Sequence, residues 1–131
     1  MSNTPGRDLT RYLTRYPEEI AFGDEAPAIV FDRYHVPEFV LYNDGLPLDR
    51  EKLLAHVRPA RKNATQIDVR VQDALTCGDQ VAARYTLTAR MRQGHSVATD
   101  IHMFGTLAPD GRLIRVDQLT RNVPTSEPDD R

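Results

Sequence analysis

Four β-like runs follow a helix-like segment in close succession, and this order constrains the fold of the chain more than any other feature. The helix-like segment LDREKLLAHVRPARKN falls at about residues 47–63. The runs are TQIDVRVQDAL, QVAARYTLTARMR, SVATDIHMFGTL and RLIRVDQLT. Turn signals separate them at Gly78-Asp79, Gln93-Gly94 and Ala108–Gly111. Strand-like runs joined by tight turns are typical of an antiparallel meander. The sequence therefore predicts an α+β fold in which a strongly curved antiparallel sheet packs one face on helices and encloses a pocket.

The first third of the chain predicts two more helices and a short strand. Apolar residues at helical spacing indicate a helix over 7–16, which Pro17 is expected to stop. The segment EAPAIVFDRY indicates a second helix, and EFVLYND a short strand that closes at Asp44-Gly45. Asp49 is the expected N-cap of the third helix. We expect one domain over residues 7–122, with flexible ends at 1–6 and 123–131.

Composition excludes several classes of function. The net charge is −2, and basic residues alternate with acidic ones, so no basic field attracts nucleic acid or an anionic membrane. No apolar run approaches the length of a membrane span, and no signal peptide is visible, which predicts a cytoplasmic protein. The only cysteine, Cys77, cannot form an intrachain disulfide. The four histidines lack metal-ligand spacing and no phosphate-binding loop occurs, so neither a metal nor a cofactor is expected.

The three turns, taken at their shortest, predict which residues face each other across the sheet. Asp73 would face Arg84, Tyr85 would face His102, and His102 would face Asp117. Alternation then places one set of side chains on a single, more apolar face, which we assign to the concave side under the helices. Its members are Ile67, Val69, Val71, Leu75, Ala82, Ile101, Met103, Ile114 and Val116, with the polar Asp73, Arg84, Thr86, Thr88, Thr99 and Gln118.

The opposite face is too mixed for a core and too aromatic for plain solvent contact, which suits a homodimer interface between sheets. It carries Asp68, Arg70, Gln72, Ala83, Tyr85, Leu87, Asp100, His102, Phe104, Arg115, Asp117 and Leu119. A single β-bulge would exchange part of the two faces.

The segments PEFVLYNDGLPLDREKLLAHV, QVAARYTLTAR and IHMFGTLAPDGRLIRVDQLT resemble SnoaL-like members of the nuclear transport factor 2-like superfamily. The resemblance extends over roughly residues 8–122. It implies a cone, in which a curved sheet wraps around about three N-terminal helices, and usually a homodimer. The superfamily includes polyketide cyclases, ketosteroid isomerases and limonene-epoxide hydrolases, as well as members without known activity.

Two departures from the isomerase pattern argue against that chemistry here. In the isomerases, a carboxylate base lies in the strand after the second helix, where this chain has Tyr42, with Asp44 two residues later. The acidic oxyanion donor of the isomerases corresponds to Met103. SnoaL-type cyclases use acidic and histidine groups near the end of the sheet, which His102 and Asp117 match by type.

Five residues are candidates for catalysis. Arg84 would hold a carboxylate or enolate oxygen while Asp73 orients it, or the two form a structural salt bridge. His102 and Asp117 would form a general-base pair, or a polar contact within a dimer interface. Tyr42 would donate a hydrogen bond to a carbonyl group.

The candidate substrate-binding residues share an expected place around the cavity. Tyr12 and Tyr16 would roof it, although tyrosines on an amphipathic helix are most often core residues. His35 and His56 are interpreted as surface or helix-end residues. The complete set is Tyr12, Tyr16, Asp44, Thr86, Ile101, Met103, Val116 and Gln118.

Three functions remain open from the sequence. The first is a cofactor-independent enzyme that cyclises, isomerises or opens the epoxide of a largely apolar organic molecule by acid–base chemistry. The second is a non-catalytic module that binds a small hydrophobic ligand. The third is an interaction protein that works through its convex sheet. Fold alone does not decide among them.

Overall fold

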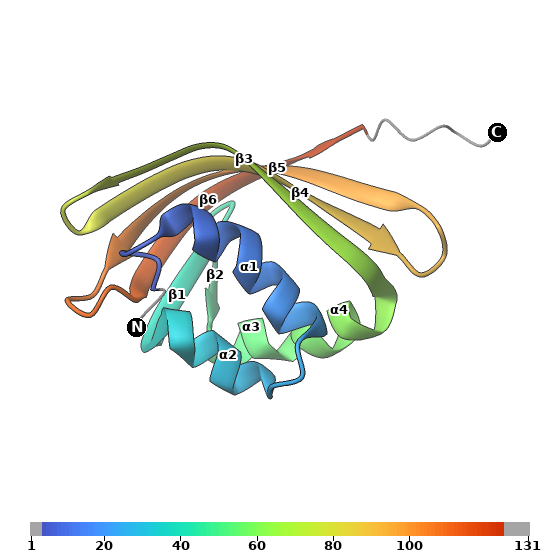
Figure 1. Ribbon diagram of the computed structural model, residues 1–131, viewed down its shortest axis with the longest axis horizontal. Helices are drawn as coiled ribbons and strands as arrows, with labels where there is room; N and C mark the ends of the chain where they lie inside the picture. Colours follow the sequence, from blue (N-terminus) through green and yellow to red (C-terminus); the bar gives the residue numbers. More distant parts are fainter. Residues whose placement is uncertain (1–3, 125–131) are drawn as a thin grey trace.

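A six-stranded sheet arches over the helices in the computed structural model, which describes residues 4–124 (Figure 1). The helices are α1 (Leu9–Phe22), α2 (Pro27–Tyr34), α3 (Arg50–Ala55) and α4 (Val57–Asn63). The strands are β1 (His35–Asn43), β2 (Leu46–Asp49), β3 (Ala64–Cys77), β4 (Gln80–Met91), β5 (Ser96–Leu107) and β6 (Leu113–Val123). Their order across the sheet is β2-β1-β6-β5-β4-β3. The α+β cone expected from the sequence is confirmed.

The sheet is mixed rather than wholly antiparallel, which corrects one part of the prediction. β1 pairs with β6 in parallel, while every other neighbouring pair is antiparallel. Antiparallel neighbours are joined by short turns, but the chain between β1 and β6 is long enough to return in the same direction. The short strand β2, which the sequence analysis missed, pairs with β1 at the edge.

Local sequence signals explain most helix boundaries. The Asp8 and Asp49 carboxylates accept hydrogen bonds from the backbone N–H groups of Arg11 and Lys52, both at 3.0 Å, so the predicted Asp49 cap is confirmed. Pro27 occupies the first turn of α2. The predicted third helix is divided at His56 into α3 and α4.

The prediction that Pro17 ends the first helix is wrong. α1 continues through Pro17 to Phe22. Beyond the proline, Ala21 is buried and Ile20 packs against the core. This tertiary packing offsets the hydrogen bond to Leu13 that a proline cannot donate.

The register of β3 and β4 agrees with the prediction only near the turn. Gly78-Asp79 forms the expected two-residue loop, and Asp73 faces Arg84. A bulge between Val71 and Asp73 then shifts the pairing, so that Val71 faces Tyr85 instead of Thr86. Because side chains alternate with a period of two, the extra residue places Asp73 and Leu75 on the face opposite to that of Val71.

The other two predicted registers are wrong. The Met91 N–H donates to the His95 carbonyl, so the β4–β5 loop is longer than the predicted Gln93-Gly94, and Arg84 faces His102. His102 in turn faces Leu119 rather than Asp117. The β5–β6 loop is one residue longer than predicted, since Leu107 faces Leu113, and an irregularity between Thr106 and Leu107 adds a second residue.

These shifts change which side chains face the helices. Ala83, Tyr85 and Leu87 belong to the concave side, where they pack with the core. The predicted concave residues Asp73, Leu75, Ala82, Arg84 and Thr86 lie on the outer side, and Ile114 is also partly exposed.

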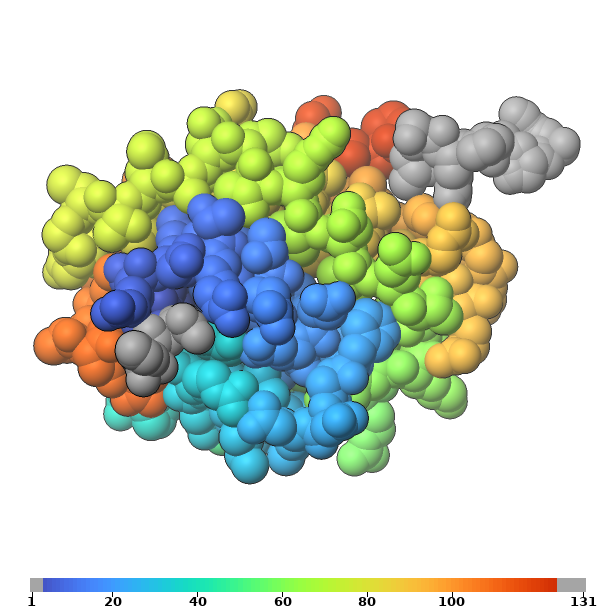
Figure 2. Space-filling model, in the orientation of Figure 1, coloured from blue at the N-terminus to red at the C-terminus, as the bar shows by residue number. Residues whose placement is uncertain are grey.

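The core lies between the concave face and the helices α1 and α2. On the surface, α1 lies beside β3 (Figure 2). Pro5 is fully buried, and the Gly6 N–H donates to the Gly111 carbonyl, so residues 4–6 are not the flexible end that we predicted. Of the other residues in the predicted ends, 1–6 and 123–131, Val123 belongs to β6, and residues 1–3 and 125–131 lie outside the described residues.

Candidate functional site

A pocket of about 330 Å³ lies inside the cone, bounded by the sheet and by residues of α1, α2, α3 and α4. Its wall is largely aliphatic and aromatic, with polar groups supplied by tyrosine, histidine and glutamine side chains. None of the described residues that line it is Asp, Glu, Lys or Arg. The polar members are Tyr12, Tyr16, His35, His56, Tyr85 and Gln118. A charged ligand would therefore lose its hydration without gaining a counter-ion.

His35 is the most deeply buried polar group of this wall, with 2 % of its surface exposed. Its Nδ1 lies 2.9 Å from the Phe31 carbonyl oxygen, and its Nε2 lies 2.8 Å from the Tyr12 hydroxyl. Burial lowers the pKa of His35 from 6.5 to about 4, although the Phe31 carbonyl and the Asp32 carboxylate oppose the shift. The ring is therefore neutral at neutral pH.

Tyr16 and Tyr85 bring two more hydroxyl groups to the pocket. Within residues 4–124 neither hydroxyl has a hydrogen-bond partner, yet neither is sealed in the core as an unpaired buried atom. Burial raises the pKa of both phenols, so they are neutral donors at physiological pH. Gln118 completes the set, and its amide donates to Asn43 Oδ1 at 3.0 Å.

The pocket contains six of the residues predicted to bind substrate. Tyr12 and Tyr16 come from α1, Ile101 and Met103 from β5, and Val116 and Gln118 from β6. Alternation along β5 and β6 was sufficient to group the four strand residues. The register between these two strands differs from the prediction by two residues, which leaves each side chain on the same face.

Sequence reasoning missed His35 and Tyr85. His35 was interpreted as a surface or helix-end residue; it is the C-cap of α2, but it is buried. The one available signal was its place four residues after Phe31, on the apolar side of α2. Tyr85 was assigned to the outer face because of the incorrect β4 register.

The five predicted catalytic residues line a different feature, a groove of about 670 Å³ on the outer face of the sheet. These are Tyr42, Asp73, Arg84, His102 and Asp117. The predicted position of Asp73 and Arg84 in the concave cavity is therefore wrong.

Ion pairs and a cation–π contact organise this outer groove. Arg84 and Asp73 form an ion pair of 2.6 Å with side chains 57 % and 56 % exposed. Arg115 pairs with Asp117 at 2.9 Å and lies 4.1 Å from the centre of the Tyr42 ring. The predicted His102–Asp117 pair does not form, because β6 is displaced by two residues.

The last two predicted binding residues form hydrogen bonds outside the inner pocket. The Asp44 carboxylate accepts hydrogen bonds from the Thr120 N–H and hydroxyl, and these contacts lower the pKa of Asp44. Thr86 donates its hydroxyl proton to Asp100 Oδ1 at 2.8 Å. Neither residue lines the inner pocket.

Residues 13–116 match the SnoaL-like domain, a span that contains most of the pocket-lining residues. The chain belongs to this family. No functionally curated protein matches it.

Solved structures share the fold of this SnoaL-like protein at low sequence identity. IdmH from Streptomyces antibioticus, a candidate polyketide cyclase, is 18 % identical with a TM-score of 0.65, over 88 % of this chain and 91 % of IdmH. An NTF2-like protein of unknown function from Exiguobacterium sp. 255-15 is 16 % identical with a TM-score of 0.66, over 91 % and 98 %.

A third similar structure contains a small molecule. It is a protein with a ketosteroid isomerase-like fold from Catenulispora acidiphila, crystallised with trimethylamine. It is 10 % identical with a TM-score of 0.61, over 84 % of this chain and 82 % of that one.

Two further observations describe residues 4–124. None of their helices has the length and apolar character needed to cross a membrane. In the same part of the chain, no three His, Cys, Asp or Glu side chains gather in a cluster that could hold a metal ion.

Proposed function

We propose that this SnoaL-like protein binds a small, uncharged and largely apolar organic molecule in the inner pocket. The observation that carries the proposal is a volume of about 330 Å³ whose wall combines apolar and aromatic side chains with neutral hydroxyl groups and holds no Asp, Glu, Lys or Arg side chain. Pockets of this size and composition are typical of small-molecule sites. Tyr16 and Tyr85 are the groups that would donate hydrogen bonds to an oxygen of the ligand.

Catalysis is the second candidate, supported by the same hydroxyl groups. Two neutral phenols in a water-poor pocket can stabilise an oxygen that gains negative charge, as happens when an enolate forms. The pocket wall offers no carboxylate base, which favours binding as the primary function. A cyclase, isomerase or epoxide hydrolase activity would need the ligand itself, His35 or His56 to take up the proton.

The ligand class is tested with two probes of similar shape. 2-Acetylnaphthalene is uncharged and presents a carbonyl oxygen, whereas 2-naphthoate carries a negative charge. We expect the ketone to bind more than tenfold more tightly, because the charged probe would be desolvated without a counter-ion. Titration calorimetry at pH 7 measures both constants.

Tyr85→Phe is expected to weaken binding of the ketone about five- to tenfold, the loss of one hydrogen bond to a buried partner. Tyr42→Phe is the matched control, since Tyr42 lines the outer groove and should leave the affinity unchanged. Tighter binding of the naphthoate, or equal effects of the two substitutions, would reject the inner pocket as the binding site.

We also propose that the outer face forms a homodimer interface. Two adjacent rows of facing residues cross β3, β4, β5 and β6 there: Leu75, Ala82, Phe104 and Asp117, and next to them Asp73, Arg84, His102 and Leu119. Leu75, Phe104 and Leu119 are each more than two-thirds exposed. Exposed apolar side chains surrounded by charged residues are typical of a protein–protein interface. In this arrangement the paired charges of Asp73 and Arg84 contribute contacts at the rim.

Phe104→Asp is expected to convert the dimer into a monomer, because it introduces an uncompensated charge at the centre of the apolar patch. Sedimentation velocity over a range of protein concentrations measures the change. Phe22→Asp serves as the control, since Phe22 is exposed at the end of α1. A wild-type protein that is monomeric at all concentrations would contradict the proposal.

A further inference from the structure

We propose that Tyr12, oriented by His35, accepts a hydrogen bond from the ligand, so that the inner pocket selects neutral molecules that carry a hydroxyl or N–H donor as well as an acceptor. This inference rests on the proposed function of the same pocket. It assigns opposite hydrogen-bonding roles to tyrosines that look equivalent in the sequence.

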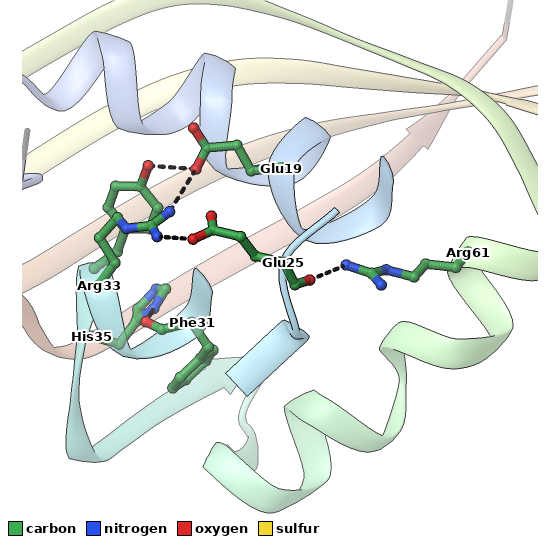
Figure 3. Close-up of polar contacts among 7 residues, drawn as sticks. Glu19, Glu25, Phe31, Arg33, His35 and Arg61 are labelled. Atoms are coloured by element: carbon green, nitrogen blue, oxygen red, sulfur yellow. Dashed lines mark hydrogen bonds and ion pairs between the residues drawn. The ribbon is translucent and has the colours of Figure 1, made fainter. Parts of the chain in front are cut away.

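The first step concerns the protonation of the His35 ring. A carbonyl oxygen can only accept, so the 2.9 Å contact with the Phe31 carbonyl places a proton on Nδ1 (Figure 3). The ring is neutral, as its burial requires, and so the other nitrogen, Nε2, carries no proton. Nε2 is therefore an acceptor.

The second step concerns the Tyr12 hydroxyl, which lies 2.8 Å from Nε2. A hydroxyl group has one proton, and here that proton must be donated to the imidazole. The Tyr12 oxygen retains only acceptor capacity towards the pocket. Tyr16 differs, because its hydroxyl has no partner within residues 4–124 and remains free to donate.

The third step is that the surrounding rings hold this arrangement in place. The His35 ring stacks on Phe31 at 4.3 Å between centroids and contacts Phe39 at 4.6 Å and Tyr16 at 5.0 Å. Tyr12 stacks on Tyr16 at 5.4 Å. A ring flip of His35 would break both of its hydrogen bonds inside an apolar environment. The Tyr12 acceptor is thus oriented before any ligand binds.

The protonation of His35 is tested directly by two-dimensional 15N NMR of the imidazole at pH 7. We expect the shifts of a protonated Nδ1 and an unprotonated, hydrogen-bonded Nε2. A ring protonated at Nε2 would overturn the inference, since Tyr12 would then accept from His35 and keep its own proton for the ligand. The measurement uses the wild-type protein without any ligand.

The selection of donors is tested with 2-naphthol and 2-methoxynaphthalene, which differ by the replacement of a hydroxyl proton with a methyl group. Wild-type protein is expected to bind the naphthol about tenfold more tightly. Tyr12→Phe should reduce this preference to less than about threefold. The matched control Tyr16→Phe, one turn further along α1, should keep the tenfold preference even if both affinities fall.

The outcomes separate this inference from the function on which it rests. If both probes bind the wild type equally, or if Tyr12→Phe keeps the preference, Tyr12 is not the acceptor although the pocket still binds apolar molecules. If neither probe binds, both the proposed function and the donor selection are rejected. Thermal unfolding of each variant verifies that the fold is intact.

Discussion

Phe31→Ala is expected to lower the free energy of unfolding by about 3–5 kcal/mol, the range for removing a buried aromatic side chain. Phe31 is 1 % exposed, and its ring stacks on His35 and meets the edge of Phe39. Its loss would create a cavity next to the pocket and leave His35 without its stacking partner. Urea unfolding followed by circular dichroism measures the change.

Phe22→Ala provides the comparison for this substitution. It removes the same group from a side chain that is 40 % exposed at the end of α1. We expect a cost below about 1 kcal/mol, as is usual for substitutions near the surface. Equal costs at the two positions would contradict the assignment of Phe31 to the core.

The second large effect is a loss of stability as the pH falls below about 6.5. His35 titrates at a pKa of 6.5 when exposed in the unfolded chain, but at about 4 in the folded protein. Between these values the unfolded state binds a proton that the native state does not, so stability decreases as the pH falls. The slope is about 1.4 kcal/mol per pH unit, and the whole effect is roughly 3 kcal/mol.

The groups that face His35 do not remove this effect. Tyr12 and Tyr16 from α1 are neutral in this pH range. The Asp32 carboxylate raises the pKa of His35, but the opposite effect of burial is larger. The carboxyl groups of Asp32 and Asp44 have lowered pKa values, so they titrate below this range. A loss of stability between pH 6.5 and 5 therefore reports on the histidine.

Urea unfolding at pH 6.5, 6.0, 5.5 and 5.0 measures the slope. His35→Gln is expected to flatten it, whereas His102→Gln, on the exposed outer face, should preserve it. NMR titration of the wild-type His35 ring provides a second measurement if His35→Gln does not fold. A ring that becomes protonated near pH 6.5 in the native state would refute the prediction.

The strands illustrate how much of the fold can be predicted from local sequence. The four β-like runs correspond to β3, β4, β5 and β6 within two or three residues, and the Gly78-Asp79 turn and the Asp49 cap form as expected. Each of these features depends on neighbouring residues alone. Pro17 is the counterexample, since packing of the residues after it continues the helix.

The pairing between strands depended on information that alternation does not contain. A bulge between Val71 and Asp73, and a β4–β5 loop one residue longer than the shortest turn, moved Arg84 to the outer face. Neither change alters the pattern of apolar and polar residues within a strand. Asp73, Arg84 and Thr86 were therefore placed on the wrong side of the sheet, whereas His102 and Asp117 lie on the outer face to which they had been assigned.

By itself the sequence determined the order of the elements, the bounds of most strands and the residues of β5 and β6 that line the pocket, because those properties follow from short-range periodicity. Only the tertiary structure decided which face Arg84 occupies and that His35 is buried beside Tyr12. Both depend on contacts between segments far apart in the chain. In those contacts, a shift of one residue, or the packing of one helix on another, determines whether a polar side chain meets solvent or the core.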